Sequence, residues 1–471
     1  MAKPSLEPGL MLDGFSIGEL LHRGGMASLW EVTKPGDDRP LLMKIPNLQE
    51  GEDPAAIVSF EMEQMIMPRL KGTHVPAFVA AGDFAVQPFI VMERLPGKPL
   101  ITRLPELPLP LDEVVSIGAR VADALESIHR QHVVHLDLKP SNIMFRDDGT
   151  AVMIDYGLAH HAQLPDLMKE EFRLPYGTAP YMAPEQVLGI RNDPRSDIFA
   201  LGVLLYFFAT GTRPFGEPER LKGLKRRLWM DPTPPRKLKP DLPPWFQEIV
   251  LRCLEVKASS RYPTAAQLRF DLTHPDQVHL TERAERMEHD SLLTRLKRRF
   301  EPELSLIDVP RNDGAEASDA PIVVVAIDLQ AQEQLGPHLR QTVTRILERS
   351  PKARLACLNV MKESLITIDA KLDEAGHNRH VQRLVELKEW ARPLGLNEGR
   401  ATYHVLESTD PADSILEYAR QNNVDHIVMG ARTNSTMRKL LGSVSGKVAA
   451  EAPCSVTVVR SRAVPEIDAA P

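Results

Sequence analysis

Cysteine is scarce in this sequence. The chain has 471 residues and only three cysteines, Cys253, Cys357 and Cys454, which lie far apart. So few cysteines exclude a disulfide framework, and their wide spacing excludes the paired cysteines of a typical metal site. We therefore expect the protein to work in a reducing compartment, the cytoplasm.

Long apolar runs are missing as well. The most apolar stretch, residues 198–210, is shorter than the about 20 residues that a membrane-spanning helix needs. We expect it to be a buried helix, and we expect neither a signal peptide nor a membrane span. The net charge of -7 and the lack of a basic cluster argue against a nucleic-acid partner.

Three motifs follow one another in the first half of the chain. They are His135–Asn142 (HLDLKPSN), Asp155–Gly157 (DYG) and Ala183–Glu185 (APE). Apolar residues at 133–134 and 151–154 predict short buried strands that hold the first two motifs in place. In this order the motifs resemble the catalytic loop, the metal-binding turn and the end of the activation segment of protein kinases. The resemblance implies a two-lobed α+β kinase fold over residues 14–273.

The same resemblance assigns roles to four side chains. Asp137 would orient the acceptor hydroxyl and take its proton, and Lys139 would steady the transferring phosphoryl group. Asn142 and Asp155 carry the hard oxygen ligands that Mg²⁺ prefers. The implied cofactors are ATP and Mg²⁺, with Mn²⁺ as an alternative ion.

Residues 20–29 resemble the glycine-rich loop that covers ATP phosphates with backbone amides. The pattern is degraded, because His22 and Ala27 stand where the family has its first and third glycines. By itself this glycine pair is more typical of a hairpin turn, and only its place before Lys44 favours the glycine-rich loop. The residues assigned to this part of the ATP site are Leu21, Gly24, Gly25 and Leu29.

Lys44 ends an apolar strand and matches the lysine that binds the α- and β-phosphates in this family. Its partner should lie on the next helix, where the apolar register favours Glu63, with Glu61 as the second choice. A solvated glutamate is the alternative interpretation. Residues 89–97 resemble the hinge between the lobes, and backbone groups near Glu93 and Leu95 would meet adenine.

The motif residues around 137–142 and 177–185 resemble those of serine/threonine kinases, bacterial members above all. Asp197 and Arg261 match structural anchors of the family, with Arg261 placed to pair with Glu185. We interpret these residues as holding the fold.

The residue before the catalytic aspartate is usually an arginine that binds a phosphorylated activation loop, and here it is Leu136. Residues 158–176 contain no serine or threonine, but they include Asp166, Glu170 and Glu171. Hydroxyl residues that could carry the phosphate and the arginine that would bind it are both missing. We therefore hypothesise that activity does not depend on activation-loop phosphorylation.

A chain of this length predicts a further domain. Residues 274–320 read as a charged, helical and then flexible linker, in which Thr281, Ser291 and Thr294 are candidate phosphorylation sites. From 321 to 461, apolar strands at 322–327, 355–360, 426–429 and 456–459 alternate with helix-length segments. This order predicts a doubly wound α/β domain with a parallel sheet.

The second domain resembles the universal stress protein family. Its nucleotide-binding members hold phosphate at a strand-to-helix turn, and the residues here that match their motif are Asp328, Gly430, Gly442 and Ser443. Thr433 replaces the second glycine of that motif. ATP binding and a structural or dimerising role are therefore both open for this domain.

Taken together, the sequence predicts a serine/threonine kinase coupled to a stress-type regulatory domain. Its partners would be protein substrates, the chain itself among them, and a second copy bound through the C-terminal domain. The alternatives are a pseudokinase scaffold, suggested by His22 and Ala27, and a nucleotide-sensing stress adaptor.

Overall fold

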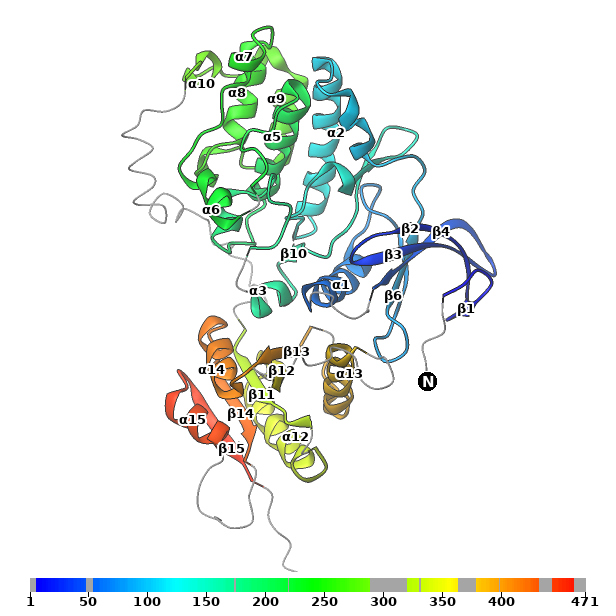
Figure 1. Cartoon of the computed structure of the whole chain (residues 1–471), viewed down its shortest axis with the longest axis vertical. Coiled ribbons are helices and arrows are strands. Elements are labelled where there is room, and N and C mark those ends of the chain that lie inside the picture. The colour runs from blue at the N-terminus through cyan, green and yellow to red at the C-terminus, as the bar shows by residue number, and fades with distance from the viewer. Residues whose placement is uncertain are drawn as a thin grey trace, which may run out of the picture.

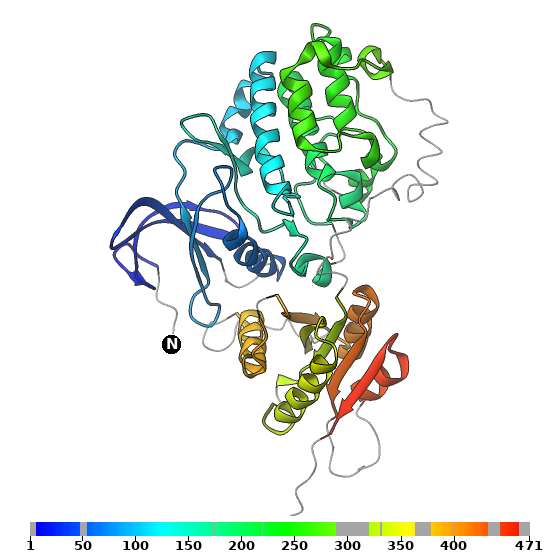
Figure 2. The same cartoon turned by 180° about the vertical axis from the view of Figure 1, so that it is seen from behind.

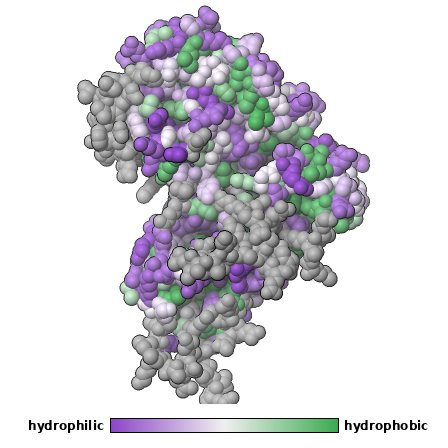
Figure 3. Space-filling view, viewed as in Figure 1, coloured by the Kyte–Doolittle hydropathy of each residue, from purple (hydrophilic) through white to green (hydrophobic). Residues whose placement is uncertain are grey.

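The computed structural model describes residues 6–47, 54–172, 175–218, 220–288, 320–329, 332–362, 378–397, 399–431 and 443–460. Figure 1 shows two lobes, blue and cyan to green, above a smaller layered domain coloured yellow to red. Figure 3 shows hydrophilic and hydrophobic residues mixed in small patches over the visible described surface.

The N-terminal lobe is an antiparallel sheet covered by one helix. The sheet order is β1-β2-β3-β4-β6-β5. The alternation of side chains buries Met43 and Ile45 in the sheet core and turns Lys44 to the opposite face, where the helix α1 lies. The elements are β1 (Met11–Leu12), β2 (Phe15–Arg23), β3 (Ala27–Lys34), β4 (Asp37–Pro46), α1 (Pro54–Ile66), β5 (Phe78–Gly82) and β6 (Phe89–Glu93).

The second lobe is built around α5 (Arg195–Thr210). This helix is apolar on nearly all sides because α2, α7 and α8 contact it, and it confirms the prediction of a buried helix at 198–210. None of the described helices is long and apolar enough to cross a membrane. The other longer helices of this lobe are α2 (Leu111–His129), α8 (Pro244–Cys253) and α9 (Ala265–Thr273).

Short strands and helices lie in the segments that connect these longer helices. The strands expected at 133–134 and 151–154 are present as β7 and β9. The short elements are β7 (Val133–Val134), β8 (Ile143–Phe145), β9 (Ala151–Met153), β10 (His160–His161), α3 (Leu167–Glu171), α4 (Pro184–Val187), α6 (Leu221–Leu224), α7 (Pro235–Leu238) and α10 (Glu282–Glu285). Segments of 3-10 helix lie at Met67–Arg69, Leu100–Glu106, Pro140–Asn142, Lys225–Leu228, Ala258–Ser260, Pro275–Gln277 and Arg392–Leu394.

The predicted anchors of the large lobe are confirmed. Arg261 donates from both terminal nitrogens to Glu185, at 2.6 and 2.8 Å, and both side chains are fully buried. Asp197 at the start of α5 accepts the backbone N–H groups of His135 and Leu136, each at 2.8 Å. The start of the catalytic loop is therefore fixed to the most buried helix of the lobe.

The beginning of the predicted linker packs on the large lobe. The helix α10 contacts α8, and Gln247 donates to the backbone carbonyls of Arg283 and Ala284. Thr281 caps α10 and donates its hydroxyl to Glu248 at 2.8 Å. This candidate phosphorylation site is thus already engaged, whereas Ser291 and Thr294 lie outside the described residues.

The C-terminal domain is a parallel sheet in the order β13-β12-β11-β14-β15. Helices α12 and α13 contact one face, and α14 and α15 contact the other, so the predicted doubly wound architecture is confirmed. The elements are β11 (Ile322–Ala326), α12 (Gln332–Arg349), β12 (Arg354–Lys362), α13 (Arg379–Ala391), β13 (Ala401–Ser408), α14 (Pro411–Gln421), β14 (His426–Gly430), α15 (Ser443–Glu451) and β15 (Ser455–Val459).

One strand of this sheet was missed by the sequence analysis. The strand β13 forms an edge and contains the buried polar residues Thr402 and His404, which interrupt its apolar pattern. His404 lies at the boundary between the domains, where α3 contacts β13 (Figure 2), and the Thr402 hydroxyl is hydrogen-bonded to its ring. All three cysteines are free, as expected.

The buried pair Arg261–Glu185 generates a test of the fold. Replacing Arg261 with Met leaves the Glu185 carboxylate buried without its cation, and breaking a buried pair in this way costs about 3–5 kcal/mol. We expect the first urea unfolding transition of the full chain to shift by about that free energy.

The control is Arg269→Met, which breaks the half-exposed pair with Asp123 and should change stability by less than about 1 kcal/mol. Equal shifts for the two variants would show that the buried pair does not hold the lobe.

Candidate active site

Asp137 lies at the centre of a buried hydrogen-bond network. Its carboxylate accepts the ammonium of Lys139 at 2.6 Å and the amide of Asn142 at 3.1 Å. The other oxygen accepts the backbone N–H of Thr178 at 3.0 Å and its hydroxyl at 2.7 Å. The carboxylate is thus held in one orientation, with one oxygen within hydrogen-bond reach of a hydroxyl group.

Lys44 joins the two lobes through its ammonium group. It donates to Glu63 of α1 at 2.6 Å and to Asp155 at 3.0 Å. Burial would lower the pKa of Lys44, but the charges of Asp155 and Glu63 outweigh it and raise that pKa. Mainly through the charge of Lys44, the pKa of Asp155 falls to about 2. The structure thus pairs Lys44 with Glu63, the first choice from the sequence, while Glu61 pairs with Lys388.

The metal-binding turn packs closely against α1. A Cβ on Gly157 would lie 2.1 Å from the Ser59 hydroxyl oxygen and 3.1 Å from the Ser59 carbonyl oxygen, so only glycine fits beside this helix. Asp155 has a φ of 68°, in the left-handed region. The position of α1 and the shape of this turn consequently depend on each other.

Two of the predicted site residues carry the oxygens that suit Mg²⁺. The carboxylate of Asp155 is 43% exposed, and its lowered pKa keeps it ionised at neutral pH. The side chain of Asn142 is oriented by donating to the Asp137 carbonyl oxygen at 3.0 Å, and its own oxygen accepts the Ser141 hydroxyl at 3.2 Å and keeps a second lone pair for a metal ion. One carboxylate and one amide fit a magnesium ion that takes its remaining ligands from phosphate and water. Among the described residues, no cluster of three or more His, Cys, Asp or Glu side chains offers another metal site.

The glycine-rich turn is held by a residue that the sequence analysis missed. Asn47, just after β4, donates its side-chain amide to the carbonyl oxygens of Gly24 at 2.8 Å and Gly25 at 3.0 Å. Its own oxygen accepts the Ser28 hydroxyl at 3.0 Å. A polar residue after an apolar strand carries no sequence signal of such a contact, because the turn lies more than 20 residues upstream.

The remaining residues predicted for the ATP site surround this turn and the hinge. Leu21 is on β2 and is 39% exposed, and Leu29 pairs with Lys44 across β3 and β4. Leu95 is buried after β6, and Glu93 at the end of β6 accepts from Arg146 of the large lobe at 2.9 Å. Hydrogen bonding by Arg146 lowers the pKa of Glu93. The contact of this hinge with adenine stays a prediction.

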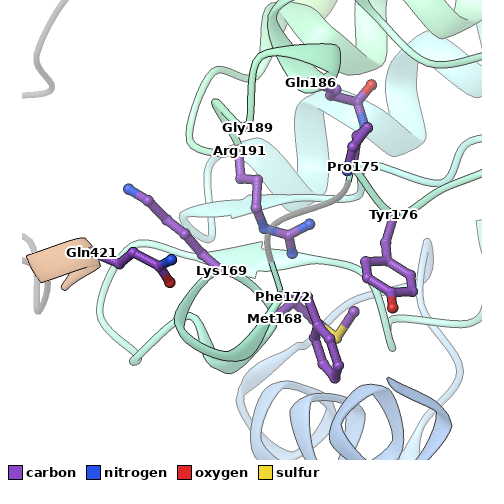
Figure 4. Close-up of a pocket in the computed structure, with 9 residues that line it drawn as sticks. All are labelled: Met168, Lys169, Phe172, Pro175, Tyr176, Gln186, Gly189, Arg191 and Gln421. Atoms are coloured by element: carbon purple, nitrogen blue, oxygen red, sulfur yellow. The ribbon is translucent and has the colours of Figure 1, made fainter. Parts of the chain in front are cut away.

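The acidic residues of the activation segment have two kinds of partner. Asp166 pairs with Arg191 of the same lobe at 2.8 Å. Glu170 and Glu171, at the end of α3, face the C-terminal domain instead. Beside α3 lies a cavity of about 260 Å³ (Figure 4), and its lining comprises Met168, Lys169, Phe172, Pro175, Tyr176, Gln186, Gly189, Arg191 and, from the C-terminal domain, Gln421.

Comparison with known families agrees with this geometry. The protein kinase domain family matches residues 15–271, more than half of the chain. The chain belongs to the protein kinase family. The universal stress protein family matches residues 321–460 of this kinase. The predicted combination of a kinase with a stress-type domain is thus confirmed.

Curated relatives of this kinase are bacterial serine/threonine kinases. PknL of Mycobacterium tuberculosis is 31% identical over 57% of this chain and 67% of its own length. PksC of Streptomyces coelicolor is 30% identical over 54% of this chain and 48% of its own length. PknB of Mycolicibacterium smegmatis is 28% identical over 56% of this chain and 43% of its own length. The kinase therefore spans less than half the length of the last two relatives.

The second nucleotide site predicted in the kinase's C-terminal domain is described only in part. Asp328 is exposed just after β11, and Gly430 ends the neighbouring strand β14. Ser443 begins α15, whereas Gly442 and the variant position Thr433 lie outside the described residues. A Cβ on Gly430 would lie 2.8 Å from a terminal methyl group of Leu335 on α12, so a larger residue here would require that side chain to move. Nucleotide binding here stays a prediction.

The contact between Asn47 and the glycine-rich turn leads to a prediction about the kinase. Asn47→Ala and Asn47→Asp both remove the amide donor that fixes the two glycine carbonyls. Each lost hydrogen bond is worth about 0.5–1.5 kcal/mol, so we expect the KM for ATP to rise about tenfold with a smaller change in kcat.

Steady-state kinetics at varied ATP concentration would measure this effect. The matched control is Ser28→Ala, which removes only the bond on the other side of Asn47 and should change KM less. If Asn47→Asp behaved like the wild type, the amide donor would have no part in shaping the turn.

Proposed function

We propose that this kinase transfers the γ-phosphoryl group of ATP to serine or threonine hydroxyls of proteins, with Asp137 at the centre of the site. The observation that carries the proposal is the 2.7 Å hydrogen bond from the Thr178 hydroxyl to the buried Asp137 carboxylate, with Lys139 3.1 Å from the same hydroxyl oxygen. A hydroxyl in this position has a base on one side and a cation on the other.

Each charged group has a separate task in this proposal. Asp137 orients the acceptor hydroxyl and accepts its proton, and Lys139 stabilises negative charge beside it. Lys44, held by Glu63, binds phosphate oxygens of ATP. Asn142 and Asp155 would hold Mg²⁺, which neutralises charge on the phosphates.

The glycine-rich turn covers the phosphates in the same proposal, although it lacks two family glycines. Asn47 fixes the carbonyls of Gly24 and Gly25, which restricts the turn by side-chain contacts in addition to glycine content. The pseudokinase interpretation rested on His22 and Ala27 alone. No observation among the described residues favours it or the nucleotide-sensing adaptor over phosphoryl transfer.

The partners in the proposal are protein substrates, with the kinase itself as one candidate. Phosphorylation of Ser291 or Thr294, dimerisation through the C-terminal domain and a cytoplasmic location are predictions from the sequence.

The first test of this function is the Asp137→Asn variant. Loss of a general base lowers the rate about 10²–10⁴-fold, and the amide keeps the side chain's shape. We expect radiolabel from ATP in protein with the wild type and almost none with the variant, while both bind Mg²⁺ and ATP in a thermal-shift assay.

Asp147→Asn is the matched control, because Asp147 is exposed in the nearby turn between β8 and β9. It should transfer phosphate at the wild-type rate. Absence of transfer by the wild type despite ATP binding would reject the proposed function in favour of a pseudokinase.

A second test addresses activation. We propose that activity needs no phosphate on the activation segment, because Leu136 replaces the receptor arginine and residues 158–176 lack serine and threonine. Phosphatase treatment should leave the initial rate unchanged within about twofold, and Tyr176→Phe should do the same. A phosphate on Tyr176 or Thr178 that is required for activity would contradict this proposal.

A further inference from the structure

The helix α3 of the activation segment lies between the large lobe and the C-terminal domain. Figures 1 and 2 both show it at the junction, directly above the sheet that contains β12 and β13. It contacts α1 on the kinase side and both β13 and α14 on the other side. A helix of five residues is too short to form alone in water, so these contacts determine its structure.

The C-terminal domain surrounds the carboxylate of Glu170 with donors. Arg354 of β12 donates to one oxygen at 2.6 Å. Tyr418 of α14 donates its hydroxyl to the other oxygen at 2.9 Å, and His404 of β13 lies 3.1 Å from the same oxygen. The other ring nitrogen of His404 is 2.7 Å from Glu171. One imidazole therefore links two consecutive carboxylates of the activation segment.

In this buried cluster the ionised forms of His404 and Glu170 are favoured, whereas burial raises the pKa of Glu171. Burial would lower the pKa of His404, but hydrogen bonds with Glu170 and Glu171 outweigh burial and raise that pKa to about 9. Burial would likewise raise the pKa of Glu170, yet hydrogen bonding by His404 and the charge of Arg354 lower it. Two cations of one domain thus meet two acids of the other, away from water.

A second contact reaches α1, the helix that carries Glu63. Lys388 of α13 donates to Glu61 at 2.6 Å, and its ammonium lies 4.7 Å from the centre of the Phe84 ring. Only Met62 separates Glu61 from Glu63, and α1 also contacts α3. The C-terminal domain therefore binds α1, which carries Glu63, and α3, which belongs to the activation segment.

We propose that the C-terminal domain activates the kinase from within the same chain by serving as the receptor for Glu170 and Glu171. Arg354 and His404 hold the two acids as a cationic pocket holds a phosphorylated loop, and Lys388 holds α1. The proposal rests on the proposed kinase function and adds its regulation.

The state of the catalytic groups favours activation over inhibition. With the domain docked, Lys44 is paired with Glu63, and Thr178 is bonded to Asp137. Phosphoryl transfer requires the first arrangement, and the second fixes the orientation of the Asp137 carboxylate. The contacts of the domain lie on the outer side of α1 and α3, and none of the three cations named above contacts Asp137, Lys139 or Asn142.

The test compares variants of the full chain that remove single interface charges. Glu170→Gln keeps the side chain's shape, and Lys388→Met keeps its length. The control is Arg383→Met on the same helix as Lys388, because Arg383 pairs within α13, with Glu386, and its side chain is equally exposed, at 27%. A charge reversal, Glu61→Lys with Lys388→Glu, tests rescue.

We expect both interface variants to lower kcat about tenfold, within the 5–150-fold range of typical coupling between sites. Amide hydrogen exchange should increase in α1 and α3, while the control behaves like the wild type. The single Glu61→Lys variant should be slow, and the reversed pair should recover most of the rate. Unchanged or increased kcat in Glu170→Gln and Lys388→Met would overturn the proposal.

Hydrogen exchange separates this inference from the proposed function. If the wild type transferred no phosphate, the kinase function would fail, and the exchange of α1 and α3 would still report on docking. Unchanged exchange in both interface variants would overturn the inference whatever the activity.

Discussion

The ammonium of Lys44 is the point at which three parts of the kinase meet. It comes from β4, pairs with Glu63 of α1 and binds Asp155 of the large lobe. Because one cation satisfies carboxylates from two lobes, the small lobe, the helix and the metal-binding turn cannot be placed independently. Gly157 adds a steric condition to the electrostatic one, since α1 can approach the metal-binding turn this closely only where the turn has no side chain.

The catalytic loop depends on a second fixed point in the large lobe. Asp197 accepts two successive backbone N–H groups and thereby holds Leu136 at a φ of 62°, a conformation that is strained for leucine. Gln186 of α4 donates to the Leu136 carbonyl at 2.8 Å, so this short helix supports the same residue. This support from both sides orients Asp137, the next residue, toward Thr178.

The boundary between the domains is unusual for its buried charge. Apolar side chains of similar size would hold two domains together as well or better, since burying ions costs desolvation energy. Charged groups, however, require particular partners in particular places. A cluster of Glu170, Glu171, Arg354 and His404 therefore specifies one docked arrangement where apolar residues would tolerate several.

Much of the kinase site could be predicted from the sequence because its residues lie in short motifs. Asp137, Lys139 and Asn142 fall within one loop, and the helical register of α1 distinguished Glu63 from Glu61. Asn47 could not be predicted in this way, because its role arises from a turn that only strand pairing brings beside it. The strand β13 was missed because His404, an interface residue, interrupts the apolar pattern by which strands are identified.

By itself the sequence determined the two fold classes, the order of the domains and the chemistry available at the kinase site. Local patterns suffice for these, since apolar periodicity and motif spacing act over a few residues. Only the tertiary structure decided what Glu170 and Glu171 do. Glu170 meets Arg354 across 184 positions of the chain, and such a contact depends on how two separately built cores pack together, which no local pattern encodes.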